Sequence, residues 1–191
     1  MAMIGEIIES RTWEFIVETV EYDFKLPYGS FVKVDDGGRT VFGIVAGTAT
    51  ASIDNNVRAK AFFKPLDELK LEQPQIFSLL KTEAHCIVLG YREEGVYRPY
   101  YPPTHLPLHL QVEFADDDEI MQITDGLSYL IKTIEAKDTN CEELTAAALR
   151  KAASLRENKR EYLVEAGREL FKILDYDTQK LKSIMERVDI A

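Results

Sequence analysis

The sequence predicts an α+β protein in which a small N-terminal β-barrel is followed by an α-helical C-terminal domain. Up to about residue 114, short segments rich in β-branched and aromatic residues alternate with turn residues. From Asp116 onward, apolar residues recur at the helical period. We therefore expect a barrel with a proline-rich exit strap over residues 1–114, a connecting helix over 115–137 and a small helical bundle over 138–191.

Turn residues delimit the expected strands. The segments GSFVKV and TVFGIVAGTAT follow IGEIIES and WEFIV, and they flank the turn residues Asp35-Asp36-Gly37-Gly38. A further turn at Asp54–Asn56 precedes the strand-like VRAKAFF, and AHCIVLGY and LHLQVEF come after a short helix near Asp67–Leu80. Several short strands of this kind favour a barrel or a sandwich. Glycines inside the strands (Gly5, Gly43 and Gly47) favour the bends that close a barrel.

Capping patterns mark the helix starts. Asp116 with Glu119 is an acidic variant of the capping box, and Asn140 with Glu143 is a second N-terminal pair. Two further helices are expected near Arg160–Leu174 and from about Asp177. Each helix has one apolar face to bury, so the last three predict a bundle. The apolar stripe of the connecting helix consists of Ile120, Ile123, Leu127, Leu130, Ile131 and Ile134.

Composition indicates a soluble globular protein. Of 191 residues, 46% are hydrophobic and 29% are charged, which are ordinary values for a chain with a packed core. The longest apolar runs fall far short of the ~18–20 residues that cross a membrane, and the N-terminus lacks the pattern of a signal peptide. Two cysteines fit a reducing compartment better than a disulfide scaffold. We therefore expect a cytoplasmic protein with no membrane partner.

Charge argues against strong binding of DNA by the N-terminal part. The net charge is −10, and residues 138–191 account for −1 of it, so residues 1–137 carry −9. A solvated helix face, balanced by neighbouring glutamates, is the simplest reading of the one basic concentration. In the alternative, the chain is a nucleic-acid accessory factor in DNA processing or repair, and these basic residues contact phosphates weakly or indirectly. They are Arg150, Lys151, Arg156, Lys159 and Arg160.

Motifs of catalysis and metal binding are missing or incomplete. The glycines at Gly38 and Gly43 have the spacing of a phosphate loop, but the Lys-Ser/Thr pair that would hold phosphates and magnesium does not follow. The run Ala115–Glu119 lacks the spaced oxygens of a calcium loop and fits a helix start. We therefore expect no catalytic residue, no metal and no cofactor. One alternative is an enzyme with an unrecognised site, formed where Glu93, Tyr97, Arg98 and His105 converge.

Histidines and cysteines do not have the spacing of a metal site. Pro107 separates His105 from His109 and argues against a helix that would bring both to one face. In an extended strand these two histidines would lie ~13 Å apart, too far to share an ion. His85 and the adjacent Cys86 form no zinc-type pair, and Cys141 has no base close to it in sequence.

The stretch VYRPYYPPTHLPLHL, Val96–Leu110, combines four prolines with three tyrosines and two histidines. It contains a P-x-x-P pattern that aromatic grooves could bind, but strand-like segments flank it directly. A stiff, folded connector is therefore the favoured interpretation, with its side chains as candidates for an interface. The interface candidates are Tyr97, Arg98, Tyr100, Tyr101 and His105.

The order of these motifs resembles a known family. IGEIIES with Gly5, YGSFVKV with Gly29 and VFGIVAGTA with Gly43 are similar to the HAS barrel, which HerA-type DNA translocases share with the catalytic subunits of rotary ATP synthases. The passage RPYYPPTHLPLHLQVEFADDDEIMQI is similar to the proline-rich segment, strand and acid-capped helix of HerA-like proteins. The similarity extends over about residues 4–130.

This resemblance implies assembly rather than catalysis. In the family, the barrel packs against neighbouring barrels in a ring and docks partner proteins, including a nuclease in the HerA case. The family's catalytic residues belong to an ATPase core with a phosphate loop, and here a helical segment without that loop follows the barrel. We therefore expect a non-enzymatic interaction module that binds itself, a barrel-bearing ATPase or a nuclease.

Overall fold

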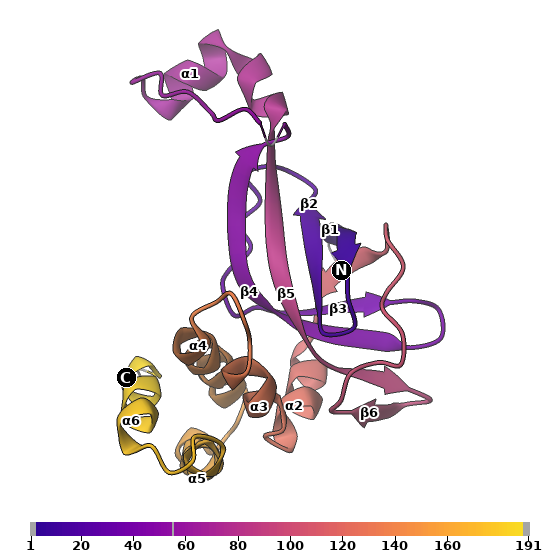
Figure 1. The fold of residues 1–191 in the computed structure, drawn as a ribbon, viewed down its shortest axis with the longest axis vertical. Helices are drawn as coiled ribbons and strands as arrows, with labels where there is room; N and C mark the ends of the chain where they lie inside the picture. The colour runs from indigo at the N-terminus through magenta and orange to yellow at the C-terminus, as the bar shows by residue number, and fades with distance from the viewer. Residues whose placement is uncertain (1–2, 55, 189–191) are drawn as a thin grey trace.

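The computed structural model describes residues 3–54 and 56–188, and it shows an antiparallel β-barrel with helices packed against one end (Figure 1). The predicted α+β class is confirmed. The strands are β1 (Met3–Ser10), β2 (Glu14–Thr19), β3 (Phe31–Asp35), β4 (Thr40–Ser52), β5 (Leu80–Glu93), β6 (Val96–Arg98) and β7 (Gln111–Phe114). The helices are α1 (Leu66–Glu72), the 3₁₀ helix η1 (Pro74–Leu79), α2 (Asp117–Asp125), α3 (Tyr129–Ile134), α4 (Cys141–Ser154), α5 (Lys159–Ile173) and α6 (Thr178–Arg187).

Six of the strands close into a barrel. The order is β2-β1-β7-β3-β4-β5, and an additional pairing between β2 and β5 completes the circle. All these pairings are antiparallel, while β6 extends the sheet only as a hairpin on β5. β7 inserts between β1 and β3, so the barrel closes only after the chain has returned from the β5–β6 hairpin.

Two local devices shape the barrel. In the turn between β3 and β4, Asp35 accepts a hydrogen bond from the backbone N–H of Gly37, and Gly37 adopts a left-handed conformation with φ +83°. In β1, Gly5 lies so close to β2 that a Cβ atom would come within 2.0 Å of the carbonyl oxygen of Glu18. Glycine at position 5 is therefore required by the close approach of β1 and β2, whereas the sequence suggests that it permits a bend.

The strands β3, β4 and β5 bury side chains on both of their faces. Val32, Val41 and Val88 point into the barrel and belong to its interior cluster. Phe42 and Leu89 point outward and belong to a second cluster, which contains helical residues from Ile120 to Val188. The helices α2–α6 thus cover the outer face of these strands, and barrel and helices share one hydrophobic core.

The helix starts follow the predicted caps. Asp116 and Glu119 form both bonds of a capping box at α2, and the Asn140 side chain accepts a bond from the backbone N–H of Glu143 at α4. Asp177 caps α6 in the predicted place.

The single connecting helix expected over residues 115–137 is wrong, because the chain forms α2 and α3 with a break between them. Gly126 disfavours a continued helix, and Leu127 adopts a left-handed conformation with φ +56°. Side chains distant in sequence donate hydrogen bonds to the carbonyl oxygens at the end of α2. Tyr162 Oη donates to Thr124 O at 3.2 Å, and Arg156 donates to Met121 O at 3.4 Å. These donors satisfy the end of α2 and stabilise the break.

Between β4 and β5 the chain leaves the barrel as a projection, the arm (residues 53–79, with Asn55 of the predicted turn outside the described residues). The strand-like character expected for VRAKAFF is wrong in this structure, since residues 57–63 pair with no strand of the described chain. The expected short helix is present as α1 and continues into η1. The described residues include no helix that is both long and apolar enough to span a membrane.

Candidate interaction surfaces

The strap (residues 99–110) is fixed across one end of the barrel. Leu106 is 1% exposed and packs into the barrel interior, while its backbone N–H donates to Ser10 Oγ at 3.1 Å. Arg39 donates to the hydroxyl and carbonyl oxygens of Thr104, and Asp36 holds the Arg39 guanidinium at 2.8 Å. The predicted connector is therefore well anchored, and its apolar anchor enters the barrel core.

The structure separates the five predicted interface residues. Tyr97 is half-buried: its ring packs edge-on against Phe42 at the margin of the core between barrel and helices, and burial raises the pKa of its hydroxyl. The other four remain accessible to different degrees, with Tyr100, Tyr101 and His105 exposed and Arg98 half-buried. The interface role of all five residues stays a prediction.

The residues of the alternative enzyme site do not converge. Tyr97 points inward, and its hydroxyl lies 3.4 Å from the carbonyl oxygen of Leu89. Arg98 meets Glu93 at 3.8 Å and Tyr100 at 3.3 Å near the surface, while His105 lies on the exposed strap. Of the four side chains, only Glu93 and Arg98 form an ion pair with each other in the described structure, and the enzyme alternative stays a prediction.

Three of the five basic residues proposed for phosphate contact interact with other groups of the same chain. Arg150 pairs with Glu143, and Lys151 pairs with Asp117 at 2.9 Å. Arg156 lies over the Tyr162 ring at 4.0 Å and bonds to the end of α2. These three side chains stabilise the packing of α4 against its neighbours.

The remaining two, Lys159 and Arg160, lie at the rim of an apolar groove between α5 and α6. The groove has a volume of about 790 Å³, and its apolar lining includes Leu163, Phe171 and Met185. The five basic residues are thus divided between contacts within the chain and this rim. The nucleic-acid alternative stays a prediction.

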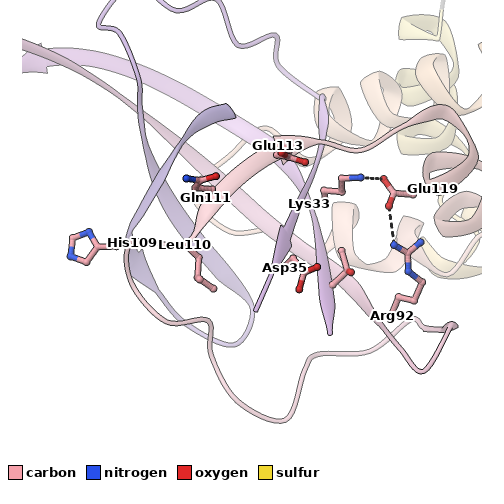
Figure 2. A pocket seen from close by; sticks show the side chains of 9 residues that line it. Lys33, Asp35, Arg92, His109, Leu110, Gln111, Glu113 and Glu119 are labelled. Carbon is pink, nitrogen blue, oxygen red and sulfur yellow. Dashed lines mark hydrogen bonds and ion pairs between the residues drawn. The ribbon is translucent and has the colours of Figure 1, made fainter. Parts of the chain in front are cut away.

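A charged pocket of about 530 Å³ lies where α2 meets the barrel (Figure 2). At its inner side, the Glu119 carboxylate is 8% exposed and accepts hydrogen bonds from Lys33 Nζ at 2.8 Å and from Arg92 Nη2 at 2.9 Å. Burial alone would raise the pKa of this carboxyl, but the bonds from Lys33, from the Asp116 backbone N–H and from Arg92 together hold the pKa below its ordinary value.

This arrangement fits a structural clamp. The carboxylate of Glu119 faces two cations and one backbone donor, so its oxygens are occupied by partners within the fold. Sequence reasoning identified Glu119 only as a helix cap, because Lys33 and Arg92 lie far away along the chain. The pairing of β3, β4 and β5 brings their side chains together.

Histidines and cysteines lie apart from one another. His85 Nε2 contacts Glu14 at 2.9 Å, and His109 lies 3.5 Å from Glu6. Cys86 is buried in the barrel, where burial raises the pKa of its thiol, while Cys141 is half-buried at the start of α4. In the part of the chain that the structure describes, no group of three metal-binding side chains occurs.

The arm exposes large apolar side chains. Phe63 is 98% exposed, and neither α1 nor η1 buries a residue. The second half of the arm is held to the barrel: Phe77 stacks on Tyr22 at 5.5 Å, and Lys70 pairs with Asp23 at 3.2 Å. Sequence reasoning missed this surface, although its apolar residues were visible. The exposed large apolar residues of the arm are Ile53, Val57, Phe62, Phe63, Leu66, Leu71 and Leu79.

Comparison with known families agrees with this geometry. Residues 4–94 match the family model described as the HAS barrel domain. This segment is a HAS barrel domain. The domain is found in HerA-like ATPases, and the match covers β1 to β5, whereas the closing strand β7 lies beyond it. No curated protein matches the chain.

Proposed function

We propose that the chain is a non-enzymatic assembly module, in which the HAS barrel presents the arm to another protein. The partners that fit this proposal are a second copy of the chain, a barrel-bearing ATPase or a nuclease. The single observation that supports it is the apolar surface of the arm, centred on Phe63 and Leu71.

Exposing the apolar side chains of the arm to water is unfavourable in free energy for an isolated protomer. Large apolar side chains exposed together favour association, and seven of them are exposed on this one projection. The arm projects from the end of the barrel opposite the helices, so the chain's own helices do not cover it (Figure 1). Its attachment through Phe77 and Lys70 holds the exposed residues in place without burying them. A projecting, anchored apolar surface is suited to docking on a partner.

The test compares a variant of the arm with the wild-type chain. We expect Phe63→Ser with Leu71→Ser to abolish association, measured as molar mass by light scattering over a range of concentrations and as recovery of partners from native lysate. Val164→Ser with Tyr176→Ser is the matched control, since both residues are exposed apolar side chains on the helical side. Circular dichroism verifies that each variant is folded.

A wild-type chain that is monomeric at every concentration and recovers no barrel-bearing ATPase, nuclease or second copy would overturn the proposal. Equal association of the arm variant and the wild-type chain would also overturn it.

A further inference from the structure

The first half of the arm has the pattern of a strand without a neighbour. Residues 57–64 are all exposed, and within the described chain their backbone makes one hydrogen bond, from Val57 N to Asp54 O. In an extended chain, successive side chains point to opposite sides, so the alternation separates two faces. In an extended arrangement of residues 57–62, one face carries Val57, Ala59 and Ala61 and the other carries Arg58, Lys60 and Phe62, and the left-handed conformation of Phe63, with φ +55°, ends the alternation.

This segment is also the basic part of an acidic molecule. Residues 56–64 contain three basic residues and no carboxylate, in a chain with a net charge of −10. Lys64 pairs with Glu68 and Glu72 of the same arm. Arg58 and Lys60 form no ion pair with any residue in the described ranges. Two cations are therefore available at the arm's surface.

A complementary surface lies on the outer face of the same barrel. The strand register places Glu6 of β1 opposite Glu18 of β2, and Glu18 opposite Glu83 of β5. These three carboxylates form an acidic row across adjacent strands. Like charges placed directly opposite each other destabilise a sheet, so this row lowers the stability of an isolated barrel.

The acidic row is only partly neutralised within the protomer. Glu83 pairs with Lys81 at 2.6 Å, and His109 lies 3.5 Å from Glu6. Glu18, at the centre of the row, is exposed and forms no ion pair among residues 3–54 and 56–188, and the one cation that attracts it, Lys81, is already paired with Glu83. The cluster that packs under the helices contains no residue of β1 or β2, so helical packing leaves this face open.

We propose that the basic face of residues 57–62 in one copy binds the acidic row of a second copy, with Arg58 and Lys60 on Glu6, Glu18 and Glu83. This inference deepens the assembly function proposed above and rests on it. Copies with a net charge of −10 repel one another on average, so a contact between them requires local complementarity, and the chain carries both halves of it. Ile16 is half-buried and lies two residues before Glu18 on β2. It offers an apolar contact for Phe62.

The contact is head-to-tail, because arm and acidic row are different surfaces. One contact leaves a free arm on one copy and a free row on the other. Further copies, or a reciprocal exchange between two copies, then satisfy both surfaces.

Charge reversal with rescue tests the inference by sedimentation velocity. We expect Arg58→Glu with Lys60→Glu, and separately Glu6→Lys with Glu18→Lys, to weaken self-association by about tenfold or more. Combining all four substitutions should restore it, because opposite charges face each other again. Lys159→Glu with Arg160→Glu is the control, since it changes the net charge equally on α5 and should leave self-association close to wild type. Raising the salt concentration from about 0.01 M to about 1 M, which shortens the screening length from roughly 30 Å to roughly 3 Å, should weaken the wild-type contact.

Failure of rescue in the fourfold variant, or unchanged association after reversal of Arg58 and Lys60, would overturn the inference. A wild-type chain that stays monomeric would overturn it as well. In that last case the assembly function still stands if a barrel-bearing partner is recovered and the substitutions at Phe63 and Leu71 abolish its binding.

Discussion

Removing the charge of Glu119 should loosen the attachment of α2 to the barrel. In the variant Glu119→Gln, the single amide oxygen can replace one carboxylate oxygen, and the amide nitrogen then faces the donor of Lys33 or of Arg92. A hydrogen bond to a charged group contributes about 1.5–3 kcal/mol, and the partial exposure of both cations favours the lower end. We therefore expect a loss of about 2 kcal/mol in the free energy of unfolding, or roughly 4–8 °C in melting temperature for a chain of this size.

The control is Asp117→Asn, in the same first turn of α2. The Asp117 side chain is 67% exposed and pairs with Lys151 at 2.9 Å, so its loss should cost less than about 0.5 kcal/mol. Urea unfolding followed by circular dichroism measures both variants. If Glu119→Gln is no more destabilising than Asp117→Asn, the interpretation of Glu119 as a clamp is wrong.

The pH dependence gives a second measurement on the same variant. The pKa of the Glu119 carboxyl is lowered in the folded protein, so its stabilising effect is fully present above the ordinary value of 4.5 and is lost as the pH falls through the lower folded value. The stability difference between the wild-type chain and Glu119→Gln should therefore be constant near neutral pH and should shrink below about pH 4.5. A difference that grows on acidification would contradict this linkage.

Two further substitutions test the barrel. Gly5→Ala should destabilise the protein by more than about 3 kcal/mol, because the added Cβ would overlap the backbone of Glu18. In Gly47→Ala the added Cβ meets no atom within 4 Å, so this control should be nearly neutral. Equal losses of the two variants in thermal melts would refute the close approach of β1 and β2. Leu106→Ala should cost about 2–4 kcal/mol and the exposed Leu108→Ala less than about 0.5 kcal/mol, and equal losses in urea unfolding would show that the strap does not anchor in the core.

Local chemistry made much of the fold predictable from sequence. The caps at Asp116 and Asn140 depend on side chains three residues apart, so the sequence contains everything that forms them. The Asp35–Gly38 turn likewise follows from residue type. The break between α2 and α3 was less predictable, because Arg156 and Tyr162, which satisfy the end of α2, come from distant helices.

The candidate surfaces depend on contacts that no local pattern contains. Tyr97 lies in a proline-rich stretch, and only the structure shows that its ring packs against Phe42 of β4. The alternation of residues 57–62 predicts a strand, and only the structure shows that these residues pair with no strand of the described chain. The row of Glu6, Glu18 and Glu83 likewise required the strand register, since three distant glutamates carry no signal by themselves.

The position of β7 has a consequence for how the chain folds during synthesis. β7 is the last barrel strand to be made, yet it lies between β1 and β3, so β1 must wait for a neighbour that emerges more than a hundred residues later. Strands so distant in sequence pair slowly, because the entropy cost of closing the long loop comes before the free energy gained from their contacts. Until residues 111–114 leave the ribosome, the nascent barrel has open edges on β1 and β3, where a chaperone or another nascent copy can bind.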